Sequence, residues 1–242
     1  MSDAPLRPPG AVKRFYETVA AEPAEGGFAV RLDARRLATP EGRALLLPTM
    51  ALAEAIAREW AGQGERLDPR AMPLTRLANT AIDRIGANPR AALDELGGFA
   101  ACDLLCYRAE SPESLVRRQE ARWQPLLDWL AERHGARLAV ARGIVAVAQT
   151  SEALTAVERA FARESAFRLA GAVGAVGLLG SAVLVLALLE GRLSPEDAWE
   201  ASRLDEEFQI AQWGRDAENE ARTARLKAEF DAAHEFLVLS VP

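Results

Sequence analysis

The sequence predicts an α+β protein with a small β-rich N-terminal domain, built as a twisted sheet or an open barrel, and a larger, mostly α-helical C-terminal domain. Apolar residues before Pro48 alternate with polar ones or lie between turn-forming residues, which is typical of strands, whereas later ones recur every three or four residues, as in helices. The chain has 242 residues and 50% hydrophobic content, enough to bury a large core. We expect a flexible tail over residues 1–12, the β-rich domain over residues 13–70 and the helical domain over residues 71–242.

The clearest strand, residues 28–32, follows a pair of glycines and carries three alternating apolar side chains on one face. We expect another strand over residues 14–20. A further pair should flank the turn at residues 40–42, with residues 44–47 as the return strand. Three or four short strands suffice for a small sheet or open barrel but not for a large domain.

Helical periodicity starts after Thr49, a predicted N-cap, and the first helix should end at Gly62. A second helix is expected over residues 74–85. A third should start at Pro89, which suits the first position of a helix.

A long helix is predicted from Ser111, the expected N-cap, with Pro112 at the first helical position. It should end at His134, where Gly135 supplies the stop. Because Pro125 lies inside this helix and has no backbone N–H, we expect a kink or break just before it.

An extended segment over residues 137–148 and a helix over residues 151–169 should follow. Residues 169–189 then carry no charge, a run long enough to cross a bilayer core of ~30 Å. Four glycines in its first half each weaken a helix by ~1 kcal/mol relative to alanine, and no aromatic anchor lies at either end. We therefore favour two short buried helices, the second starting at Ser181, over a membrane span, and expect no stable membrane insertion.

The last helix is predicted from Ser194, with Asp197 completing a capping box. It meets no helix breaker before Gly214 and is expected to continue past it to about Phe230. A final strand over residues 235–241 is predicted from their alternating side chains.

This helix carries the most informative cluster of the chain, Asp205, Glu206 and Glu207. Consecutive helical residues are ~100° apart, so the three carboxylates cannot converge on one substrate atom. Apolar residues lie on more than one side of the same helix, Trp213 among them, which suits a helix that touches both its own core and a partner. A solvated helix face and an acid/base site of an enzyme on residues 194–220 remain the alternatives.

Composition disfavours several function classes. A net charge of −6 and a pI near 5.2 argue against a nucleic-acid partner, because neutralising phosphates needs a cationic surface. His134 and His234 lie 100 residues apart. Cys102 and Cys106 have no second pair to complete four ligands, so we expect no metal and no cofactor. We expect both cysteines to be small buried residues on one helix face. The glycines of residues 171–180 lack the following lysine of a phosphate-binding loop and indicate close helix packing instead.

The compartment is predicted from the N-terminus and the cysteines. Residues 1–10 match neither a secretory signal nor an organelle presequence. Two cysteines in a chain of this length give no disulfide framework, which is typical of a reducing compartment. We expect a cytoplasmic protein that is not an enzyme.

Several blocks of the sequence carry a family resemblance, and the most specific is MPLTRLANTAID, residues 72–83. The other blocks lie at residues 13–16, 30–33, 39–42, 55–60, 180–184, 206–210 and 213–214. Together they resemble one chaperone family, whose members assemble the F1 sector of ATP synthase by binding the free α subunit. Ala34 stands where the family's turn usually has glycine after the aspartate, which leaves the type of that turn open.

The resemblance implies a β-rich N-terminal domain, a helical C-terminal domain, no cofactor and the free α subunit as partner. The chaperone would reversibly shield the α surface that the β subunit later covers, and would be monomeric when free. Lacking a presequence, the chain looks like a bacterial relative that works in the cytoplasm, where mitochondrial relatives work in the matrix.

The partner-binding residues that the acidic helix and the resemblance together suggest are Asp205, Glu206, Glu207, Gln209 and Trp213. The acids would face basic groups of the α subunit, and the tryptophan would supply an apolar anchor. The resemblance supports Glu206 and Glu207 best. Whether these two point at the partner or brace the chaperone's own fold is left open by the sequence.

Overall fold

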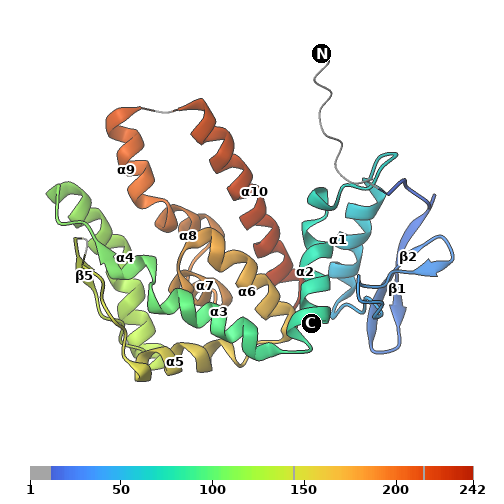
Figure 1. Cartoon of the computed structure of the whole chain (residues 1–242), viewed down its shortest axis with the longest axis horizontal. Coiled ribbons are helices and arrows are strands. Elements are labelled where there is room, and N and C mark those ends of the chain that lie inside the picture. Colours follow the sequence, from blue (N-terminus) through green and yellow to red (C-terminus); the bar gives the residue numbers. More distant parts are fainter. Residues whose placement is uncertain (1–11, 144, 215, 242) are drawn as a thin grey trace, which may run out of the picture.

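A small sheet forms one end of the computed structural model, and a larger set of helices forms the other (Figure 1). The structure describes residues 12–143, 145–214 and 216–241. The predicted α+β fold class is confirmed. The tail predicted over residues 1–12 lies outside the described residues except for its last member. The domain boundary predicted at residue 70 stays a prediction, because one hydrophobic cluster includes residues from both sides of it.

Three antiparallel strands form the sheet in the order β1-β2-β3: β1 (Val19–Ala24), β2 (Gly27–Leu32) and β3 (Arg35–Arg36). Val30 and Leu32 of β2 are buried as predicted, and Phe28 is half-buried on the same face. The two predicted strands around residues 40–42 are reduced to isolated bridges, Phe28 with Leu47 and Ala38 with Ala44.

The strand predicted over residues 14–20 is wrong in its bounds, since β1 begins only at Val19. Arg14 and Tyr16, which precede it, bond to the end of the helix Met50–Ala61 instead of extending the strand. The Arg14 guanidinium donates to the Gln63 carbonyl at 2.6 Å, and the Tyr16 hydroxyl donates to the Trp60 carbonyl at 2.7 Å.

The turn between β2 and β3 contains Asp33, whose φ of 51° lies in the left-handed region. Its carboxylate accepts hydrogen bonds from the backbone N–H groups of Glu17 and Thr18 and from the Thr18 hydroxyl. These bonds lower the pKa of Asp33. Asp33 itself thus adopts the backbone conformation that favours glycine, and Ala34 follows with an ordinary φ.

The helices of the described residues are α1 (Met50–Ala61), α2 (Pro73–Asn79), α3 (Pro89–Ala101), α4 (Glu113–His134), α5 (Ser151–Phe161), α6 (Ala166–Leu179), α7 (Ala182–Leu189), α8 (Pro195–Ser202), α9 (Leu204–Trp213) and α10 (Ala217–Leu239), with the short turns η1 (Pro69–Ala71), η2 (Thr80–Ile85) and η3 (Leu104–Cys106). The predicted first helix is confirmed, because the Thr49 side chain accepts from the Leu52 N–H and Gly62 follows the last turn. The helix predicted over residues 74–85 corresponds to α2 and the π-helical turn η2.

α4 starts one residue later than predicted. Pro112 has extended dihedrals and is itself the N-cap residue, so Ser111 does not cap the helix. Pro125 does not break the helix either. Its neighbours hold the helix on the core, since Trp123 is fully buried and its indole N–H donates to the Ala201 carbonyl at 2.9 Å.

The helix predicted over residues 151–169 is wrong in its length. α5 ends at Phe161, and α6 starts after Ser165, whose hydroxyl accepts from the Arg168 N–H. The extended segment predicted before it contains the two-residue strand β5 (Ala141–Arg142), which pairs in parallel with β4 (Tyr107–Arg108).

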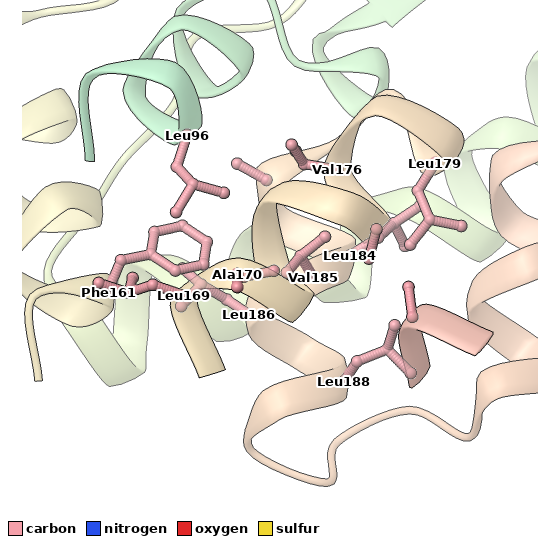
Figure 2. Packing of buried hydrophobic residues seen from close by; sticks show 14 of the residues in the cluster. Leu96, Phe161, Leu169, Ala170, Val176, Leu179, Leu184, Val185, Leu186 and Leu188 are labelled. Carbon is pink, nitrogen blue, oxygen red and sulfur yellow. The ribbon is translucent and has the colours of Figure 1, made fainter. Parts of the chain in front are cut away.

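The uncharged run forms two short buried helices, α6 and α7, as predicted. Gly180 ends α6 with a φ of 68°, and the Ser181 hydroxyl caps α7 through the Leu184 N–H at 3.1 Å. Side chains of α3, α5, α6 and α7 meet in the core around them (Figure 2). A helix with the length and apolar character for crossing a bilayer is not found in the part of the chain that the structure describes.

Glycine allows α6 and α10 to approach closely. A Cβ added to Gly171 would lie 2.6 Å from the Leu237 Cδ2. The prediction that these glycines serve helix packing is confirmed at this position.

The C-terminal third differs most from the prediction. Residues 194–230 form three helices instead of one, because Arg203 leaves helical geometry after α8 and Gly214 has a φ of 89° after α9. The strand predicted over residues 235–241 is also wrong, since α10 continues to Leu239. Phe236 and Leu237 are both buried, which a helix facing α6 permits and an alternating strand does not.

Candidate partner-binding surface

α9 lies between α4 and α10 at the edge of the helical region (Figure 1). It packs against α4 and α8. Phe208 is the buried residue of α9, and the Arg118 guanidinium of α4 lies 5.5 Å from the centre of its ring. The helix is thus attached along one side, which leaves the opposite side accessible.

Asp205 is half-buried and faces α4. The buried Gln119 side chain donates a hydrogen bond to its Oδ1 at 2.8 Å and accepts one from the Ala109 N–H at 2.8 Å. Burial raises the pKa of the Asp205 carboxyl, while the hydrogen bond from Gln119 and the positive charge of Arg108 act to lower it. Asp205 therefore holds the first turn of α9 on α4.

Glu206 and Glu207 are exposed, but their surroundings differ. Glu206 forms an ion pair with Arg203 at 3.1 Å, and Arg203 also donates to the Leu178 carbonyl. Glu206 is thereby linked to the start of its own helix. Glu207 has no ion-pair partner among the described residues, so its charge is available to another molecule.

Gln209 and Trp213 are exposed on α9, with 78% of Trp213 accessible. Large aromatic side chains that stand free on a surface are typical anchors of protein interfaces. Four of the five predicted partner-binding residues thus lie on the accessible side of α9, and Asp205 alone turns toward the fold.

A groove separates α9 from α10. We call it the α9–α10 groove; it has a volume of about 320 Å³, and its lining includes Trp199, Glu207, Ile210, Asp216, Glu220 and Ala224. The contribution of α10 was not predicted from the sequence, because one continuous helix through Gly214 cannot fold back on itself. The sequence signal for a change of chain direction was Gly214 followed by Asp216, which is the N-cap of α10.

The carboxylates of α9 do not gather around one point, since Asp205 faces α4 and the next two lie exposed. No group of three His, Cys, Asp or Glu side chains suited to a metal ion occurs within residues 12–143, 145–214 and 216–241. Cys106 is buried as predicted, but Cys102 is exposed at the end of α3, so the two thiols do not share one helix face.

A small sheet beside a helical region, with acidic and aromatic side chains accessible on one helix, is typical of a protein-binding protein. The family model described as ATP12 chaperone protein matches residues 13–131. The crystal structure of Atp12 from Paracoccus denitrificans is 42% identical with a TM-score of 0.87, and the match covers 95% of this chain and 98% of that one.

Two further relatives are similar to this chain over most of its length. A protein from Agrobacterium tumefaciens, described as a candidate chaperone, is 39% identical with a TM-score of 0.88, over 94% of this chain and 85% of that one. The mitochondrial protein Atp12 of Schizosaccharomyces pombe (strain 972 / ATCC 24843) is 27% identical over 229 residues, 88% of this chain and 77% of that one. The chain therefore belongs to the ATP12 chaperone family, and the predicted family resemblance is confirmed.

Proposed function

We propose that this chain is an assembly chaperone for the F1 sector of ATP synthase. It binds the free α subunit and shields the surface that the β subunit covers in the finished ring. Membership of a chaperone family supports this function. An unassembled subunit exposes apolar surface that promotes aggregation, so covering it reversibly is a useful activity without any chemistry. The chaperone works in the cytoplasm and is monomeric when free.

The observation that carries the proposal is the accessible side of α9. Trp213, 78% exposed, lies on the same short helix as the unpaired Glu207. An aromatic anchor and a free negative charge on one helix suit a surface of the α subunit that has an apolar pocket with basic groups around it. Gln209 adds a hydrogen-bonding group to the same helix. Asp205 contributes by positioning α9.

Charge reversal at Glu207 tests this assignment. Glu207→Lys should weaken capture of the isolated α subunit by about tenfold, because it replaces attraction by repulsion at the contact. The substitution leaves no internal partner unpaired among the described residues, and its cost at the first turn of α9 should not exceed about 1 kcal/mol. Glu206→Lys is a less clean test, since it also breaks the pair with Arg203.

The assay is co-purification of tagged chaperone with separately produced α and β subunits, together with a thermal unfolding curve of each variant. Glu132→Lys is the matched control, because Glu132 is also exposed on a helix but lies near the end of α4. We expect α to be enriched over β with wild type and control, and reduced with Glu207→Lys. Equal capture of α by all three proteins would remove Glu207 from the contact, and failure of wild type to enrich α would refute the function.

A further inference from the structure

Negative charge is concentrated around the α9–α10 groove. Residues 204–220 contain six carboxylates and one arginine, a net charge of −5, while the whole chain carries −6. The remainder of the chain is therefore close to neutral. The acids of this stretch belong to α9 and the start of α10, and Arg222, Arg225 and Lys227 follow them on α10.

The groove also has a fixed apolar part. The Trp199 ring stacks on the buried Phe230 ring, with centroids 5.6 Å apart and planes at 27°. Ile210 of α9 and Ala224 of α10 line the same groove. At about 320 Å³ its volume lies at the lower end of the roughly 300–1,000 Å³ range of ligand pockets, which gives room for a few side chains.

Two cations near the groove, Lys227 and Arg203, already have ion-pair partners. Lys227 pairs with Asp231 at 2.5 Å and lies 5.8 Å from the centre of the Phe230 ring, and Arg203 pairs with Glu206. Glu207 lines the groove and has no ion-pair partner among the described residues. The charge of Glu207 is therefore available to pair with a cation of another molecule.

We infer that the α9–α10 groove binds a cationic amphipathic segment of the client, the unassembled protein that the chaperone holds. An aliphatic side chain of this segment packs between Trp199 and Ile210, and its lysine or arginine side chains pair with Glu207 and Asp216 in the lining of the groove. The client's presence rests on the proposed function, whereas the charge and polarity of the segment follow from the groove. Charge complementarity selects this occupant over a second copy of the chain, which would bring its own charge of −6 to an acidic surface.

Two synthetic peptides test the chemistry. One is a twelve-residue helical peptide of leucine and lysine, and the other has glutamate in place of every lysine. Isothermal titration should detect binding of the lysine peptide to the full chain, weakened about tenfold or more between low and high salt because added ions screen exposed charges. The glutamate peptide should not bind. Equal binding of both peptides would overturn the inference.

A pair of variants on α10 locates the binding. Ala224→Trp fills the groove without changing charge, and Val238→Trp adds the same side chain at another exposed position of the helix. Both positions are exposed, so both variants should keep the wild-type unfolding temperature. Ala224→Trp should weaken binding of the lysine peptide about tenfold or more, and Val238→Trp should leave it unchanged.

Competition with the isolated α subunit separates this inference from the proposed function. Displacement of the lysine peptide by α, together with weaker binding of both the peptide and α to Ala224→Trp, would support the inference and the proposed function. If α binds Ala224→Trp as tightly as wild type and never displaces the peptide, the inference is wrong and the proposed function stands. If the groove binds the peptide but wild type does not bind α, the proposed function fails and the groove's preference for a cationic segment stands.

Discussion

The bond between Asp205 and Gln119 should be the main polar attachment of α9, and a double-mutant cycle can measure it. The side-chain amide of Gln119 donates to the carboxylate at 2.8 Å, with Gln119 buried and Asp205 half-buried. A hydrogen bond to a charged group contributes about 1.5–3 kcal/mol. Solvent near the half-exposed carboxylate screens part of this, so we expect a coupling energy of about 1–2 kcal/mol.

The cycle compares wild type, Asp205→Ala, Gln119→Met and the double variant by urea unfolding at pH 7. Gln119→Met alone should cost more than the coupling energy, because it also leaves the Ala109 N–H without its acceptor. The cycle removes that extra cost, since it occurs with and without Asp205. The pair Glu207→Ala and Gln119→Met is the control and should be additive within about 0.5 kcal/mol.

Binding of the α subunit gives the second measurement of the same cycle. If Asp205 positions α9, Gln119→Met should weaken α binding although Gln119 is buried, and adding Asp205→Ala should weaken it little further. A coupling energy no larger than that of the control pair would refute the positioning role. Strong loss of α binding in Asp205→Ala with no loss in Gln119→Met would assign Asp205 to the contact itself.

Two further predictions concern the fold. Burial raises the pKa of Asp103 to about 6 from an ordinary 3.8, so between these pH values the folded chain holds a proton that the unfolded chain has lost. The contribution of this group to stability should therefore fall by about 2 kcal/mol as pH rises from 4 to 6, and the free energy of urea unfolding should lack this pH dependence in Asp103→Ala. In α6, Gly171→Ala should lower stability by about 1 kcal/mol through its clash with Leu237, whereas Gly177→Ala, with nothing within 4 Å, should raise it by up to about 1 kcal/mol.

Local signals predicted the helix starts well. Thr49 and Ser194 cap α1 and α8 as expected, because a cap depends on a side chain and a backbone N–H only a few residues apart. The ends of the helices were harder to predict than their starts. α5 stops at the fully buried Phe161, in a segment with no glycine or proline to signal the end.

Buried polar groups were beyond prediction from the sequence. Asp103 is fully buried and accepts from the Ser181 hydroxyl at 2.7 Å, the Leu105 N–H at 3.0 Å and the Val183 N–H at 3.1 Å. It thereby joins η3 to the start of α7, two segments that are far apart in the sequence. A carboxylate normally indicates exposure, and only the folded chain reveals the donors that allow its burial.

Helical geometry explains how the acidic cluster on α9 can serve both attachment of the helix and the proposed recognition of a partner. The rotation of ~100° between successive residues prevents Asp205, Glu206 and Glu207 from acting on one substrate atom. The same rotation turns Asp205 toward Gln119, leaves Glu206 beside Arg203 and presents Glu207 to the groove. Asp205 faces α4, so its short side chain cannot also reach a partner on the accessible side of the helix. If Glu207 meets the partner as proposed, removing Asp205 should disturb the position of Glu207 through the helix that both share.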